Sequence, residues 1–204
     1  MTASVKWCVA VATTEPAINS WVDATGGSPP TTGGIFFHSN PLSNSGTPGG
    51  TPDTTDPLVL GTTLRYSYSA FKMAICRVDG TDVGAYTQLS NLKFLLDAAY
   101  ATGIKAAYKF SATYVDPTAS NPPAQSASDN LAGLGYTVMP TTATTWSNAA
   151  ATLTPSGSTK QRWGDFVQLI IQLDATTIAG PGTVAASGGT YAARRFTIQY
   201  DEIS

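Results

Sequence analysis

The stretch that decides the fold reads FVQLIIQL, from Phe166 to Leu173. Apolar residues occupy every odd-numbered position from Val167 to Leu173, and a period of two is typical of a β-strand with one face against a core. A second run, from Arg194 to Glu202, alternates in the same way. One face is predicted to carry Phe196, Ile198 and Tyr200, and the other Arg195, Thr197, Gln199 and Asp201. Such a division indicates an antiparallel sheet with one side in water or in contact with a partner.

Upstream segments extend this pattern. Val5 to Val11 alternates and is predicted to be a strand. Leu64 to Val78 is a long β-rich run whose apolar phase changes near Ala70, which predicts a bulge or a strand that bends between two sheets. The segment 89–102 fits two structures, because its leucines have helical spacing while Asn91 to Leu96 alternates like a strand. We favour the strand and leave the helix open.

The composition also favours β-structure. Charged residues make up 12% of the 204 residues, about half of the usual ~25%. Thr, Ser, Gly, Ala and Pro take their place, and these residues are typical of strands joined by turns rather than of helix surfaces. The predicted fold is an all-β, antiparallel β-sandwich of the jelly-roll or immunoglobulin-like type. We expect about eight strands with long Pro/Gly/Ser/Thr-rich loops, in a single domain over residues 1–204.

The segment 39–57 is predicted to be a flexible loop or arm. It is rich in glycine and proline, which sustain neither a sheet ladder nor a helix. Loops of this length are usually functional or disordered. The candidate contact residues in this loop are Ser43, Asn44, Thr47, Pro48 and Pro52.

Charge and hydropathy bear on the possible partners. The net charge is −2 and the sequence contains no basic stripe, so we expect no nucleic-acid partner. We expect no membrane partner either, since no run of about 20 apolar residues occurs. The start of the sequence does not have the pattern of a secretory signal, which leads us to expect synthesis and assembly in a cytoplasm.

The sequence offers few groups for catalysis or metal binding. His38 is the only histidine and no nucleophile elbow accompanies it, so we interpret it as structural. Asp79 to Asp82 resembles a calcium loop only faintly, because the closing glutamate is missing. Cys8 and Cys76 are interpreted as buried free thiols, with a disulfide left open. We therefore predict no catalytic, cofactor-binding or metal-binding residues and no enzymatic activity.

Three tryptophans allow two interpretations. Trp21, Trp146 and Trp163 lie near predicted loops. If they were exposed on one face, they could stack on sugar rings. We favour the other interpretation, in which they fill a core or an interface.

Several short sequence segments resemble those of a known family. They are Val5-Lys6-Trp7, Asp56-Pro57, Leu89 to Phe94, Trp163 to Leu169, and Phe196 to Ile203. Together they resemble uncharacterised structural proteins encoded among virion genes of tailed phages and other prokaryotic viruses. The resemblance implies a β-sandwich virion component, such as a capsid decoration, minor capsid or tail protein, and brings no catalytic residues.

The resemblance also implies partners and a location. The partners would be other virion proteins, namely the major capsid protein or tail proteins, and further copies of this chain. The location would be the virion, assembled in the host cytoplasm. Two other functions stay open: a carbohydrate- or receptor-binding module, and a cell-surface filament subunit that pairs through edge strands.

Overall fold

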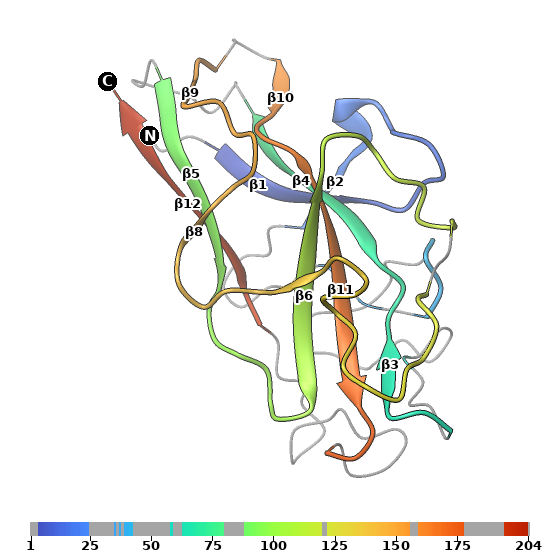
Figure 1. The fold of residues 1–204 in the computed structure, drawn as a ribbon. Helices are drawn as coiled ribbons and strands as arrows, with labels where there is room; N and C mark the ends of the chain where they lie inside the picture. Colours follow the sequence, from blue (N-terminus) through green and yellow to red (C-terminus); the bar gives the residue numbers. More distant parts are fainter. Residues whose placement is uncertain are drawn as a thin grey trace, which may run out of the picture.

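The computed structural model describes residues 4–24, 35, 37, 39–42, 58, 63–79, 88–119, 122–155, 159–177 and 194–203. In this part of the chain, two antiparallel sheets account for nearly all regular structure, and the one helical element is a 3-10 turn, η1 (Ile18–Ser20). Figure 1 shows the two sheets. The predicted all-β, antiparallel β-sandwich is confirmed. The expected eight strands are too few, since the described residues form twelve strands, several of which are only two or three residues long.

The larger sheet, here called sheet A, has the order β2-β1-β4-β11-β6-β7, with β10 paired to β4 and β3 paired to β11. Its strands are β1 (Ser4–Ala10), β2 (Val22–Asp23), β3 (Tyr66–Tyr68), β4 (Lys72–Asp79), β6 (Ile104–Ser111), β7 (Thr137–Val138), β10 (Lys160–Arg162) and β11 (Phe166–Asp174).

The smaller sheet, sheet B, has the order β12-β5-β8, with β9 also paired to β5. Its strands are β5 (Gln88–Leu96), β8 (Thr144–Thr145), β9 (Thr152–Leu153) and β12 (Phe196–Ile203). The chain crosses between the sheets several times, for example from β4 to β5 and from β5 to β6.

The main core lies between the sheets. Sheet A contributes the odd-numbered residues from Val167 to Leu173, as the alternation of that stretch predicts, and sheet B contributes Leu92, Phe94 and Leu96. An aromatic cluster fills the space between them, with the ring centroids of Trp7 and Trp146 4.8 Å apart. Each such ring pair adds about 0.5–1.5 kcal/mol beyond the burial of its surface.

A second core covers the opposite face of sheet A. There Met73 and Ile75 of β4 and Ile170 of β11 pack against Leu131 and Tyr136, which come from the connection between β6 and β7. As a result, every residue of β4 and eight of the nine residues of β11 are buried. Sheet A is therefore a middle layer, covered by sheet B on one face and by irregular chain on the other.

The phase change near Ala70 is a β-bulge, as one of the two sequence interpretations has it. Tyr68 pairs with Gln172 and Lys72 pairs with Leu169, so three residues of one strand face two of the other. The Ser69 hydroxyl accepts a hydrogen bond from the Ile171 amide at 2.9 Å and fills the gap in the ladder. The bulge brings Tyr68 and Met73 onto the same face of sheet A.

The segment 88–96 is a strand, which resolves the ambiguity between helix and strand. Its leucines have helical spacing because a second bulge interrupts β5. Asn91 adopts a φ of 57°, and two residues of β5, Asn91 and Leu92, lie opposite the single residue Tyr200 of β12. The bulge shifts the parity of the strand, so Leu89 and Leu92 both face the core.

A third interruption separates β10 from β11. After a last ladder bond from the Trp163 amide to the Cys76 carbonyl, at 2.9 Å, Gly164 and Asp165 leave the ladder. They pack against the segment Trp146–Asn148, which follows β8 of sheet B. The Trp146 indole donates to the Asp165 carbonyl at 3.0 Å, and the Trp146 amide donates to the Leu92 carbonyl at 3.0 Å. This contact, here called the junction, fastens the two sheets to each other.

Candidate functional site

The polar groups of the junction form hydrogen bonds with one another. Asp165 is 8% exposed, and its carboxylate accepts hydrogen bonds from the Ser147 hydroxyl and the Asn148 amide, both at 2.9 Å. Gly164 has a φ of 84°, and a Cβ at this position would lie 2.4 Å from Cδ1 of Trp146. The glycine is therefore required by both conformation and space. The junction is therefore scaffold: although Asn148 is exposed, its amide is used in the hydrogen bond to Asp165.

The charged side chains on β1, β2 and β4 also pair with one another. The Arg77 guanidinium, 4% exposed, pairs with both oxygens of Asp79 and donates to the Trp21 carbonyl at 2.8 Å. Lys6 lies between Asp23 at 3.1 Å and Asp79 at 3.4 Å. Asp79, the first residue of the faint calcium motif, thus has two cationic partners, while residues 80–82 lie outside the described part of the chain.

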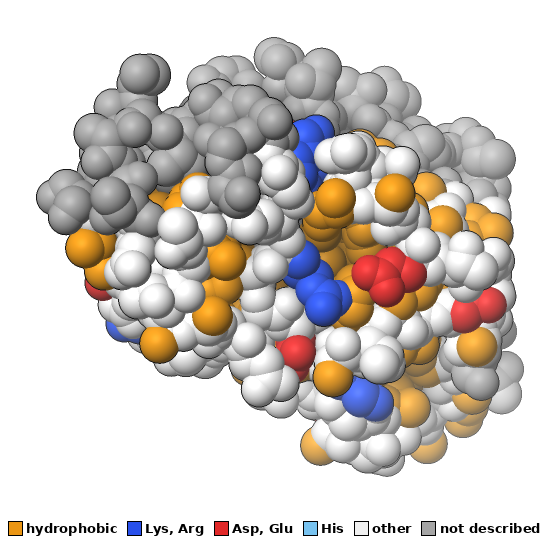
Figure 2. All heavy atoms as spheres, turned by 90° about the horizontal axis from the view of Figure 1, so that it is seen from above, with side chains coloured by type: hydrophobic (Ala, Val, Ile, Leu, Met, Phe, Trp, Pro, Cys, Tyr) orange, Lys and Arg blue, Asp and Glu red, His pale blue; other side chains and the backbone are white. Residues whose placement is uncertain are grey.

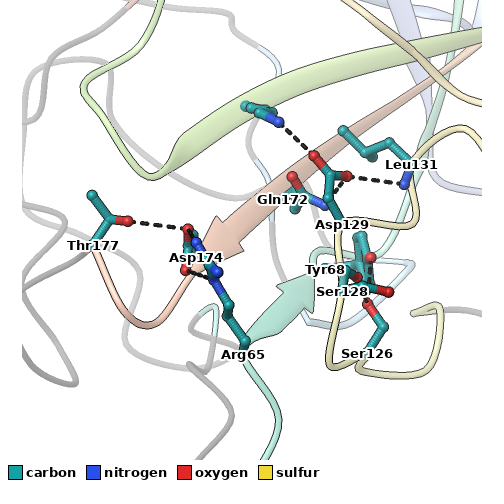
Figure 3. Close-up of polar contacts among 10 residues, drawn as sticks. Arg65, Tyr68, Ser126, Ser128, Asp129, Leu131, Gln172, Asp174 and Thr177 are labelled. Atoms are coloured by element: carbon teal, nitrogen blue, oxygen red, sulfur yellow. Dashed lines mark hydrogen bonds and ion pairs between the residues drawn. The ribbon is translucent and has the colours of Figure 1, made fainter.

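Two further carboxylates lie near the end of β11, where Figure 3 shows their contacts. Asp174 accepts two hydrogen bonds from Arg65, at 2.9 and 2.8 Å, and others from Thr176 and Thr177. Asp129 accepts from Lys105, from Gln172 and from the Leu131 amide.

These contacts set the protonation of both carboxylates. The hydrogen bond from Arg65 holds the pKa of Asp174 far below its usual range, and the hydrogen bond from Lys105 lowers the pKa of Asp129. A general acid needs a raised pKa. Asp129 and Asp174 are therefore arranged as ion-paired stabilisers of the loops around β11 and not as an acid–base pair.

Burial also governs the cysteines. Cys8 and Cys76 are both free and fully buried, as the favoured interpretation of the sequence has it. Although they lie on the adjacent strands β1 and β4, Cys8 belongs to the second core and Cys76 to the core between the sheets. Desolvation raises the pKa of Cys8 to about 12 and that of Cys76 well above its usual value, which suppresses thiolate chemistry.

The three tryptophans are core residues, so the alternative in which they form an exposed sugar-stacking platform is wrong. Trp21, Trp146 and Trp163 are 3%, 1% and 1% exposed. Trp146 packs in the core between the sheets, as does Trp163, whereas Trp21 stacks on Phe166 in the second core. The period-two pattern of the strands gives no signal for this burial, because none of the three tryptophans lies inside a strand.

The predicted contact residues Ser43, Asn44, Thr47, Pro48 and Pro52 lie outside the described residues, and so does His38. The chain just before this segment is held by Lys72 of β4. The Lys72 ammonium group is fully buried and donates to the carbonyl oxygens of Asn40 and Pro41, both at 3.1 Å. The start of the predicted contact arm is thus pinned to sheet A.

An outward-facing site remains on sheet B, and the sequence interpretation did not single it out. A recess of about 450 Å³ lies over the β5 bulge, here called the sheet B recess. Its lining residues are Asn91, Lys93, Ile198, Gln199, Tyr200 and Asp201. Ile198 and Tyr200 also pack against the core, so the polar residues supply the outward side chains.

The bulge and the register of β12 bring these polar groups together. Lys93 pairs with Gln199 across the ladder, and the bulge places Asn91 beside Asp201. The Asn91 amide donates to the Asp201 carboxylate at 3.0 Å. The sequence alternation predicts that Gln199 and Asp201 face outward, but it contains no signal that places them beside β5.

Other surface features are scattered or mixed. Figure 2 shows basic and acidic side chains interspersed on the end of the molecule that is uppermost in Figure 1. Among the residues that the structure describes, no group of three or more His, Cys, Asp or Glu side chains could hold a metal ion. In the same residues, no helix has the length and apolar character to cross a membrane.

The chain matches no protein-family model, no curated protein and no solved structure.

Proposed function

We propose that this chain is a non-enzymatic structural protein that binds a repeating protein lattice in a virion, as a capsid decoration, minor capsid or tail component. The observation that carries the proposal is how the molecule uses its polar groups. The carboxylates of Asp79, Asp129, Asp165 and Asp174 all hold strands or loops in place through internal hydrogen bonds or ion pairs. This use of the carboxylates favours a structural role over a catalytic one.

Rigidity suits binding to a lattice. A body whose side chains are already ordered loses less conformational entropy on binding. Many copies on a regular lattice then gain from avidity, so each contact can be weak. Sheet A, whose central strands β4 and β11 are buried on both faces and which the junction fastens to sheet B, supplies such a body.

The predicted contact arm starts from a fixed point. Lys72 holds Asn40 and Pro41 against sheet A, so the position at which the proposed arm begins is fixed. The resemblance of several sequence phrases to virion structural proteins supplies the biological context, and with it the expected partners: a major capsid or tail protein and further copies of this chain.

Deletion of Ser43–Pro52 tests the proposal. A matched control is deletion of Gly180–Gly189, a Gly/Ala-rich segment of the same ten-residue length. Both deletions should leave the far-UV circular dichroism spectrum and the melting temperature close to those of the intact chain. Only the first should reduce the number of copies on purified particles. Unchanged occupancy after the first deletion, or equal loss after both, would overturn the assignment of the arm as the contact.

The carbohydrate-binding alternative can no longer rest on the tryptophans. All three are buried, so a sugar site on this chain would have to use polar side chains. The sheet B recess is the place where such side chains gather.

A further inference from the structure

We propose that the sheet B recess binds a neutral saccharide through Lys93, Gln199 and the Asn91–Asp201 pair. This inference is independent of lattice binding, because these four polar residues belong neither to the core nor to the predicted contact arm. Its volume of about 450 Å³ lies within the ~300–1,000 Å³ typical of small-ligand sites.

The recess contains side chains with unused hydrogen-bonding capacity. Across the described residues, the Lys93 ammonium group makes no hydrogen bond or ion pair, although its neighbours in the recess include a carboxylate, and Gln199 makes no side-chain hydrogen bond. Asn91 donates to one oxygen of Asp201. The side-chain carbonyl oxygen of Asn91 and the second carboxylate oxygen of Asp201 remain as acceptors. This contrasts with the carboxylates of sheet A, which are bonded internally.

The mixture of donors and acceptors points to a hydroxylated ligand. Lys93 offers donors only, Asp201 offers acceptors only, and Gln199 offers both. Vicinal hydroxyl groups of a sugar ring can donate and accept side by side, and planar amide and carboxylate groups present two hydrogen-bonding atoms in the same way. A hydroxylated ring can therefore satisfy all these groups together.

The charge of the recess argues against other ligand classes. Lys93 and Asp201 give it one positive and one negative charge, so an anionic ligand would gain from the first and be repelled by the second. A single cation provides none of the basic clustering that a nucleic-acid backbone requires. The outward lining is too polar for an apolar ligand.

The bulge gives the recess its form. Asn91 is one of two non-glycine residues with positive φ in the described chain. Bulges are frequent next to functional sites, where they change the direction of a side chain. Here the extra residue turns the Asn91 side chain toward Asp201 of the neighbouring strand.

The test is an NMR titration of the ¹⁵N-labelled full chain with maltotriose, cellotriose and chitotriose, and with a sialylated trisaccharide as the charged comparison. The expected result is that at least one neutral sugar shifts the amide signals of residues 91–93 and 198–201, while the charged sugar binds more weakly. Lys93→Met and Gln199→Ala should each weaken that binding about tenfold, because each removes a hydrogen bond to the ligand.

Lys160→Met is the matched control. Lys160 lies on β10 of sheet A and does not line the recess, so this variant should bind the sugar as the intact chain does. All three variants should retain the wild-type ¹H–¹⁵N spectrum outside the altered site. The proposal is overturned if no neutral sugar shifts the recess signals, if the sialylated sugar binds best, or if Lys93→Met lowers occupancy on particles without altering sugar binding. The last result would make the recess a protein contact.

Discussion

An asparagine with positive φ that donates a hydrogen bond to an aspartate occurs twice in this molecule, once at a buried carboxylate and once at an exposed one. At the junction, Asn148 has a φ of 49° and donates to Asp165 at 2.9 Å, and in the sheet B recess, Asn91 has a φ of 57° and donates to Asp201 at 3.0 Å. The difference is the burial of the carboxylate: Asp165 is buried and Asp201 is exposed, while both asparagines are exposed. In one place the pair fastens two sheets together, and in the other it shapes a surface.

This contrast shows how the burial of a carboxylate separates a stabilising role from a role at the surface. A buried carboxylate with two donors is stabilising because the alternative is an unsatisfied polar group in the core. An exposed pair contributes little to stability because water can replace either partner. The asparagine conformation and the bond length are nearly equal in the two places, so the burial of the carboxylate and its second donor, Ser147, should determine the difference between the mutations.

The largest effect is expected from Gly164→Ala. The new methyl group would collide with the Trp146 ring, and alanine at positive φ is strained. We expect a loss of about 3 kcal/mol in the free energy of unfolding, measured by urea denaturation. Gly135→Ala is the control, since Gly135 has a φ of 80° but its added Cβ meets only the mobile end of Lys109. It should cost about 1–2 kcal/mol, and equal losses for the two variants would show that the junction contact does not matter.

The next largest effect compares the two aspartates directly. Asp165→Ala leaves the donors of Ser147 and Asn148 without their acceptor and should reduce the unfolding free energy by about 2 kcal/mol. Asp201→Ala removes the exposed partner of Asn91 and should change it by less than about 0.5 kcal/mol. The comparison breaks down if Asp201→Ala is as destabilising as Asp165→Ala.

A smaller effect should come from the bulge in β5. Asn91→Ala places a residue that disfavours positive φ at 57° and should cost about 1 kcal/mol. Asn91→Gly adopts this conformation freely, so it should be close to neutral in the same urea experiment. If both variants are equally destabilising, the Asn91 side chain stabilises the fold and the recess is part of the scaffold.

The smallest effect concerns pH and extends the comparison to the exposed ion pairs of Figure 3. Asp129 and Asp174 have pKa values lowered from an ordinary value of 3.8. Their contribution to stability is therefore present above about pH 4 and is lost as the pH falls toward their folded-state pKa values. The urea midpoint of the intact chain should fall between pH 5 and pH 3, and it should fall less in an Asp129→Asn, Asp174→Asn double variant. An identical slope for the two proteins would contradict this account.

Much of the sheet architecture could be predicted from local patterns. The alternation in the stretches from Phe166 to Leu173 and from Phe196 to Tyr200 assigned their core faces correctly, and the phase change near Ala70 marked a real bulge. These features depend on neighbours two residues away, which a sequence shows directly. The bulge at Asn91 was hidden because a parity shift within a strand gives leucines the spacing of a helix.

Features that depend on distant segments were not predictable in this way. The second core requires Leu131 and Tyr136 to cover β11, which begins thirty or more residues later in the sequence. The recess requires β12 to pair with β5 in one register, which places Gln199 opposite Lys93. Tryptophans in loops become core residues through the same kind of long-range packing.

The central claim is that this chain is a virion structural protein, and quantitative mass spectrometry across a density gradient of lysate from the source culture tests it most directly. The account predicts that the chain sediments with DNA-filled particles, in a fixed and high ratio to the major capsid or tail protein. A chain found only in fractions without particles would contradict the claim.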